Sequence, residues 1–387
     1  MISRSKALDL INEDTLHERA IARAGSSDFG TDDYREGLGV LLDSASRNSR
    51  LEKIAPRMSS LVVDVLAGRL ASQAGWNARP ETLALPVTAP LVITGLPRSG
   101  TTLLHFLMSL DPQFQWTPRW VGEAPLVRPA RDQWEQHPQY KAVHERLEAL
   151  FEANPGLRAA HEMGAGLADE CITVMVQSFI SNMFISMLPL PEYRQWFFET
   201  DETPSYVRYK DNLRLMGADT PNKTWLLKNP SHTIGMEPLL TTFPDARVVV
   251  LHRHPVETIA SGASLTYRGA DFWEKHEVGP IRLDVYSRAV KRMAAARERH
   301  PSRCLDVYYR DMVRDPLGTV RRIYAHYGLD LNAATETAMQ HWLDQNPQGK
   351  HGKHSYSSGE FGISDSDVRA AFAEYISEYS LDASVGS

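Results

Sequence analysis

Short apolar runs alternate with longer amphipathic stretches along most of this chain. The apolar runs lie at 91–94, 225–227, 248–251 and 305–308. Each run is followed by a stretch in which apolar residues recur at helical spacing. Short buried strands that are each followed by a helix are typical of a parallel sheet covered on both faces. The pattern therefore predicts an α/β fold, with a parallel sheet of about five strands flanked by helices.

The regions around this core have a different pattern. Residues 1–88 are charge-rich and helical in spacing, with Gly75 as a helix stop and three prolines in a linker at 77–90. We expect this helical region to pack on an α/β domain at 89–387. Within that domain, 113–220 has a helical pattern rich in aromatic residues and methionine, and we expect it to lie on the substrate side.

Composition excludes several classes of protein. The chain has 387 residues, 42% hydrophobic and 23% charged, which is ordinary for a globular protein. Its net charge of −6 provides no global basic field for nucleic acid. The two cysteines offer no disulfide framework and suit a reducing, cytoplasmic compartment. The most apolar long segment, 171–190, contains polar side chains, so we expect a buried helix beside a ligand and no integral membrane segment.

A glycine-containing loop follows the first predicted strand and opens the next helix. It reads Gly95-Leu96-Pro97-Arg98-Ser99-Gly100-Thr101-Thr102. Such a loop directs backbone N–H groups and a helix N-terminus at an oxyanion. The nucleotide-triphosphate pattern needs a lysine after its second glycine, where this chain has Thr101, and a cation, Arg98, stands inside the loop instead. The loop therefore indicates a phosphate-bearing cofactor other than ATP.

This loop resembles the 5′-phosphosulfate loop of sulfotransferases that use 3′-phosphoadenosine 5′-phosphosulfate (PAPS). A second element supports the resemblance: the run 248–251 ends near Arg253, and Ser261 follows eight residues later, inside the helix that Pro255 opens. In the family, an Arg and a Ser at this spacing bind the 3′-phosphate. The resemblance covers about residues 90–360. It implies that Arg98, Ser99, Gly100, Thr101 and Thr102 contact the 5′-phosphosulfate, and that Arg253 and Ser261 hold the 3′-phosphate.

Lys228 ends the predicted strand 225–227, at the sheet edge where ligands of open α/β folds bind. The resemblance implies that it contacts the bridging oxygen of the leaving phosphate, as Arg98 stabilises charge on the same group. Two residues are alternative general bases. His232 follows Lys228 by four residues and has an ordinary pKa near neutrality. Glu123 lies beyond the loop helix, near the place where some relatives carry a catalytic Glu.

Three further cofactor contacts follow from the resemblance. Tyr309 comes directly after the strand 305–308, where relatives place a nucleotide-contacting Tyr. Lys353 and His354 belong to a basic loop at 349–356 that resembles the family's late loop over the 3′-phosphate.

The acidic and histidine residues His161, Glu162, Asp169 and Glu170 lack the tight spacing of a zinc or two-metal site, so no metal is expected.

The resemblance predicts an enzyme that transfers the sulfuryl group of PAPS to a hydroxyl, less readily an amine, of a small apolar or amphipathic acceptor. Two alternatives remain open at this stage. An ATP-dependent small-molecule kinase would need ATP and magnesium, and a non-catalytic nucleotide-binding module would bind the 3′,5′-bisphosphate without turnover. The acceptor is the expected partner, no nucleic acid is expected, and a homo-oligomer remains possible.

Overall fold

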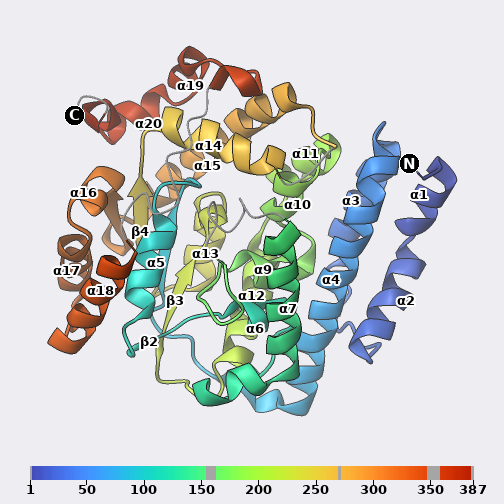
Figure 1. The fold of residues 1–387 in the computed structure, drawn as a ribbon, viewed down its shortest axis with the longest axis horizontal. Coiled ribbons are helices and arrows are strands. Elements are labelled where there is room, and N and C mark those ends of the chain that lie inside the picture. Colours follow the sequence, from blue (N-terminus) through green and yellow to red (C-terminus); the bar gives the residue numbers. More distant parts are fainter. Residues whose placement is uncertain (1, 154–162, 269–271, 347–357, 385–387) are drawn as a thin grey trace.

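The computed structural model describes residues 2–153, 163–268, 272–346 and 358–384. Its centre is one parallel sheet in the order β2-β3-β1-β4-β5 (Figure 1). The strands are β1 Leu91–Gly95, β2 Phe114–Gln115, β3 Thr224–Lys228, β4 Arg247–His252 and β5 Cys304–Tyr308. The predicted α/β class and the parallel sheet of about five strands are confirmed.

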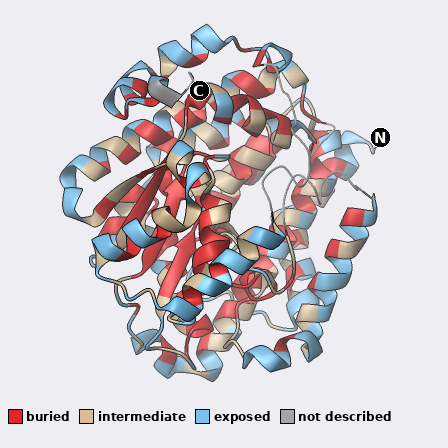
Figure 2. Ribbon diagram, turned by 60° about the vertical axis from the view of Figure 1, so that its left-hand side comes forward, coloured by how far each residue is buried: buried red, intermediate tan, exposed pale blue. Residues whose placement is uncertain are grey.

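Both faces of the sheet are buried, as the continuous apolar runs predicted (Figure 2). Alternate residues of one strand enter different cores: Leu91 and Ile93 pack with α5, α17 and α18, whereas Val92 packs on the opposite side. The helices that follow the strands are α5 Thr101–Ser109, α13 Met236–Thr242, α14 Pro255–Arg268, α15 Lys275–Arg299, α16 Tyr309–Arg314, α17 Pro316–Tyr327 and α18 Ala333–Gln345.

The N-terminal region is helical, and its long helix α4 packs against α1 and α2 (Figure 1). Its elements are α1 Arg4–Leu10, α2 Glu13–Ala24, α3 Arg35–Arg47, α4 Leu51–Ala78 and the 3₁₀ helix η1 Pro80–Ala84. Gly75 does not stop α4. A Cβ at this position would lie 2.7 Å from Leu215 Cδ2, so the glycine permits close packing between α4 and α12. The boundary at 88/89 stays a prediction.

The region 113–220 is helical, as expected, apart from the short edge strand β2. Its helices are α6 Arg119–Glu123, η2 Arg131–Gln136, α7 Pro138–Ala153, α9 Ile172–Met175, η3 Val176–Ser178, α10 Asn182–Met187, α11 Pro191–Glu199 and α12 Thr203–Met216. The apolar segment 171–190 is largely buried, but it is not one helix. Phe179 has a φ of +55°, and this left-handed backbone separates η3 from α10.

The remaining helices of the described residues are short. They are η4 Pro230–Thr233, η5 Pro301–Arg303, η6 Ser358–Phe361, α19 Asp365–Ala371, α20 Ala373–Glu378 and η7 Leu381–Ser384. The C-terminal helices α19 and α20 lie beside α14 and α15, on the side of the molecule toward which β4 points (Figure 1). None of the helices in the described ranges is long and apolar enough to cross a membrane.

Candidate active site

The strands end at one common edge because all of them run in parallel. The register pairs Ile93 of β1 with Lys228 of β3, Gly95 with Leu251 of β4, and His252 with Tyr308 of β5. Residues that directly follow these strand ends therefore share one side of the sheet. In open α/β sheets this is the side on which ligands bind.

The loop after β1 has an unusual backbone. Gly95 and Gly100 have φ values of +152° and +93°, and a Cβ at Gly95 would collide with Leu251 O. Arg98 has a φ of +70°, which is uncommon for a residue with a side chain. Backbone strain of this kind is often found at ligand-binding loops. The tight turn leads directly into α5, whose first N–H groups have no intrahelical acceptor.

The same loop contains a buried donor that suits an anion. Ser99 is fully buried, and its Oγ has no hydrogen-bond partner among the described residues. A buried hydroxyl without a partner is unfavourable in the free protein. Thr101, at the first position of α5, is also almost fully buried. A phosphate or sulfuryl oxygen at the N-terminus of α5 would satisfy these donors, so the loop fits the predicted group.

Four predicted cofactor residues lie together beside this loop. Arg98 Nε donates to Ser261 Oγ at 3.3 Å, and Arg253 Nη1 donates to the carbonyl oxygen of Arg98 at 2.8 Å. The guanidinium carbon of Arg253 lies 4.0 Å from the ring centroid of Tyr309. Arg98 belongs to the loop after β1, and Arg253 to the turn between β4 and α14. Ser261 lies on α14, and Tyr309 directly follows β5. Arg253 is also paired with Glu257 at 2.7 Å.

Lys228 lies next to the first turn of α5. Its side chain is only 3% exposed, and Nζ donates to Thr102 Oγ1 at 3.2 Å. Nζ also forms an ion pair with Glu170 Oε1 at 2.6 Å. The ammonium group is thus held between the first turn of α5 and a carboxylate, at the carboxyl end of β3.

Glu170 reaches this position through long-range backbone hydrogen bonds. Asp169 N donates to Thr117 O, and Cys171 N donates to the carbonyl oxygen of Lys228 at 3.0 Å. The segment before α9 is therefore attached to the end of β3. In the sequence, Glu170 stands out only as one of four acidic and histidine residues that lack the spacing of a metal site. Nothing in its local sequence pattern predicts that it meets Lys228.

The two bases expected from the sequence lie in different surroundings. Glu123 pairs with Arg146 and lies 3.7 Å from Arg119 Nε. His232 is fully buried, and its Nδ1 lies 2.9 Å from the hydroxyl of Tyr206. Burial lowers the pKa of His232 to about 3. The structure thus brings neither residue into a contact with Lys228 like that of Glu170.

Four of the residues considered from the sequence lie outside the part of the chain that the structure describes. Lys353 and His354, with the basic loop at 349–356, lie outside the described residues, as do His161 and Glu162. The remaining acids of the possible metal cluster, Asp169 and Glu170, pair with Arg119 and Lys228. In the described part of the chain, no group of three or more His, Cys, Asp or Glu residues could hold a metal ion.

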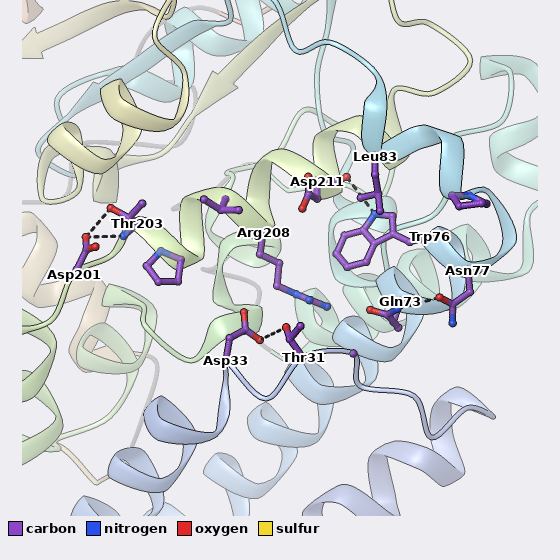
Figure 3. A pocket seen from close by; sticks show the side chains of 14 residues that line it. Thr31, Asp33, Gln73, Trp76, Asn77, Leu83, Asp201, Thr203, Arg208 and Asp211 are labelled. Carbon is purple, nitrogen blue, oxygen red and sulfur yellow. Dashed lines mark hydrogen bonds between the residues drawn. The ribbon is translucent and has the colours of Figure 1, made fainter.

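A large cleft lies away from the strand ends, between α4, α12 and the loop before α3 (Figure 3). Its volume is about 940 Å³. The buried Arg208 lines it and lies over the ring of Trp76 at 4.7 Å. Three carboxylates, Asp33, Asp201 and Asp211, also line this cleft. This charge distribution does not favour a donor that carries several negative charges.

A second cleft of about 460 Å³ is lined by apolar residues of α10, the following turn and α15, and also by the charged residues Arg50, Arg194 and Glu277. Ile185, Leu188 and Ile281 belong to its wall. Next to Ile281, the α15 residue Arg282 donates to Ser186 O of α10 at 2.7 Å. One helical turn further along α15, the hydroxyl oxygen of Tyr286 lies 3.0 Å from the position that a Cβ on Gly262 would occupy. Gly262 directly follows Ser261.

The central part of the chain is similar in sequence to known sulfotransferases. A family model described as "Sulfotransferase family" matches residues 90–333. A curated relative, omega-hydroxy-beta-dihydromenaquinone-9 sulfotransferase Stf3 of Mycobacterium tuberculosis, is 26% identical over 260 residues. The match covers 62% of this chain and 63% of the relative, so the chain spans less than two thirds of the curated relative's length.

Solved structures extend the similarity to almost the whole chain. Sulfotransferase STF1 from Mycobacterium tuberculosis H37Rv is 35% identical, with a TM-score of 0.86 over 94% of this chain and 98% of that one. STF9 from Mycobacterium avium is 28% identical, with a TM-score of 0.86 over 95% of this chain and 96% of that one. Together with the family match, which covers well over half of the residues, these similarities confirm the predicted family. The chain belongs to the sulfotransferase family.

Proposed function

We propose that this protein transfers the sulfuryl group of PAPS to the hydroxyl of an apolar or amphipathic acceptor. One observation carries the proposal: Arg98, Arg253, Ser261 and Tyr309 meet beside the α5 N-terminus, which Lys228 also faces. This arrangement offers separate contacts to two phosphate groups. The donor supplies an activated sulfuryl group when bound, and the residues of the chain bind and orient it.

Each contact has a distinct task in this proposal. Ser99 and the N–H groups at the start of α5 bind the 5′-phosphosulfate. Arg253 and Ser261 bind the 3′-phosphate, while Tyr309 holds the Arg253 guanidinium by stacking. Lys228 stabilises the negative charge that develops on the leaving oxygen. A compact ammonium that is almost fully buried is effective there, because little water screens it.

The acceptor class is supported by the apolar cleft and by the named relative. The relative's name describes a hydroxylated menaquinone, which combines a hydroxyl with a long apolar body. The cleft beside α15 could receive such a body, since Ile185, Leu188 and Ile281 line it. We therefore expect a hydroxyl on an apolar chain to be sulfated. Dodecanol can serve as a test acceptor of this kind. Ile281→Asp places a charge in the wall of the cleft, so it should raise KM for dodecanol without changing the affinity for 3′-phosphoadenosine 5′-phosphate (PAP).

Calorimetry and an acceptor screen test the proposal. PAP should bind far more tightly than AMP, because only PAP offers a 3′-phosphate to Arg253 and Ser261. Labelled PAPS with a panel of hydroxylated apolar acceptors, read by mass spectrometry, should yield a sulfated product without added magnesium. Equal affinity for PAP and AMP would contradict the donor assignment. ATP-dependent phosphorylation would favour the kinase, and tight PAP binding without any product would favour a non-catalytic module.

A further inference from the structure

The cleft beside α15 has a positive charge in its wall that no lining carboxylate offsets. Two arginines line it, Arg50 and Arg194, together with the carboxylate of Glu277. Arg50 is committed to Glu277, because its Nη1 and Nη2 each donate to one carboxylate oxygen at 2.7 Å. Such a bidentate pair satisfies both groups. Among the lining residues that the structure describes, Arg194 is then the permanently charged side chain without a partner in the wall.

The carboxylate nearest to Arg194 is held by another residue. Asp284 Oδ1 accepts a hydrogen bond from Arg288 Nε at 2.8 Å, whereas Asp284 Oδ2 lies 3.9 Å from Arg194 Nε. A separation of 3.9 Å is too long for a hydrogen bond. Within the described ranges the Arg194 guanidinium forms no hydrogen bond, and its side chain is 26% exposed. Its donors are therefore available to a ligand in the cleft.

A second cation lies next to the apolar wall of this cleft. Arg282 directly follows Ile281 and is only 2% exposed. Its Nη atoms donate to Ser186, but its Nε has no hydrogen-bond partner among the described residues. Burial lowers the pKa of Arg282, and the positive charge of Arg194 lowers it further, so the two guanidinium groups repel each other. A buried cation of this kind is unfavourable until a negative charge comes near it.

On the basis of the proposed function, we propose that the acceptor carries an anionic group and that Arg194 selects for it in the cleft beside α15. The apolar wall holds the chain that joins this group to the hydroxyl. A guanidinium binds a carboxylate or a phosphate through paired, charge-assisted hydrogen bonds. The acceptor is thus a hydroxylated amphiphile with a negative charge, and the charge of Arg282 favours the same ligand.

Acceptors of matched length test this selection. In 12-hydroxydodecanoate and 12-hydroxydodecyl phosphate an anionic group replaces one hydroxyl of 1,12-dodecanediol. With labelled PAPS, Arg194→Gln should lower kcat/KM for at least one of the two anionic acceptors by about tenfold or more, the scale of a lost charge-assisted hydrogen bond. The loss should come from a higher KM, since Arg194 does not touch the reacting atoms. Turnover of the diol should stay within about twofold of wild type, and Arg194→Lys, which keeps the charge without the planar fork, should be intermediate.

Arg47→Gln is the matched control. It removes a guanidinium three residues before Arg50 that pairs with Asp43 at 2.6 Å and does not line the cleft. It should leave the ratio of anionic acceptor to diol unchanged. Asp284→Asn, which removes the negative charge near Arg194, should instead lower KM for the anionic acceptor. Equal losses with anionic acceptors and diol, or the same ratio in Arg194→Gln and Arg47→Gln, would overturn the proposal.

A binding measurement tests the anion site without turnover. Dodecanoate and dodecyl phosphate have no hydroxyl that could be sulfated, so calorimetry in the presence of PAP reports binding alone. Wild type should bind at least one of them more tightly than dodecanol, and Arg194→Gln should lose this preference while its circular dichroism stays unchanged. Equal binding of all three by wild type would overturn the anion site. If the preference is found but no hydroxylated probe is sulfated, the proposed function fails while the anion site stands.

Discussion

The buried imidazole of His232 should make the protein sensitive to acid. Burial lowers its pKa from the ordinary 6.5 to about 3, with a small opposing effect of the negative charge on Glu170. The unfolded chain therefore binds a proton at a higher pH than the folded chain. The stability that neutral His232 contributes is complete above pH 6.5 and is lost as the pH falls toward 3. At pH 5 the free energy of unfolding is lower by about 2 kcal/mol, because each pH unit below the ordinary pKa costs about 1.36 kcal/mol.

The variant His232→Asn isolates this contribution because asparagine does not titrate. We expect the free energy of unfolding of wild type to fall by about 2 kcal/mol more than that of His232→Asn between pH 7 and pH 5. Urea unfolding followed by circular dichroism measures both values. Other buried groups cancel in this comparison. Glu202, whose pKa is raised to about 8 by burial, acts in the opposite direction in both proteins.

Parallel pH dependences of the two proteins would refute this reasoning about His232. The same variant also tests its role as a base. A buried imidazole with a pKa of about 3 is a weak proton acceptor at neutral pH. We therefore expect His232→Asn to keep turnover within about tenfold of wild type at pH 7.5, which is less than the usual loss of a general base. Abolished turnover with intact PAP binding would reinstate His232 as the base.

Four other substitutions test the donor site and the packing. Arg253→Ala should weaken PAP binding by about 2 kcal/mol in calorimetry, because charge-assisted bonds to phosphate are lost, and an unchanged Kd would show a structural role. Lys228→Ala should lower turnover by about a hundredfold while PAP affinity changes less, and equal losses would place its effect in binding. Gly279→Ala should lower the free energy of unfolding by about 1–3 kcal/mol, and with it the melting temperature, because its Cβ would meet Phe361 O. Gly39→Ala, with open space around it, should instead stabilise α3 slightly, and destabilisation there would contradict the packing argument.

Four of the five strands could be predicted from short apolar runs, because strands buried on both faces leave a continuous apolar signal. The exception, β2, has only Phe114 and Gln115, and it forms because its backbone pairs with β3. A strand of two residues is too short to produce an apolar run or an alternating pattern in the sequence. Gly75 shows a different limit: glycine ends many helices, yet here it admits Leu215 into the side of α4.

The candidate site also contains residues whose position the sequence predicts and one whose position it does not. Arg98, Lys228, Arg253 and Tyr309 each lie within a few residues of a strand end, so parallel topology alone brings them to one edge. Glu170 follows no strand. It reaches Lys228 because its own segment, which is far from β3 in the sequence, forms a backbone hydrogen bond with the end of that strand. A contact of this kind depends on the tertiary structure.

The electrostatics of the free site explain how an acidic chain can hold a highly charged donor. Two of the cations at the strand edge already have a carboxylate partner: Glu170 lies at Lys228, and Glu257 at Arg253. These pairs offset the repulsion among the neighbouring cations before a ligand arrives. A donor with two phosphate groups would replace the carboxylates at the same ammonium and guanidinium.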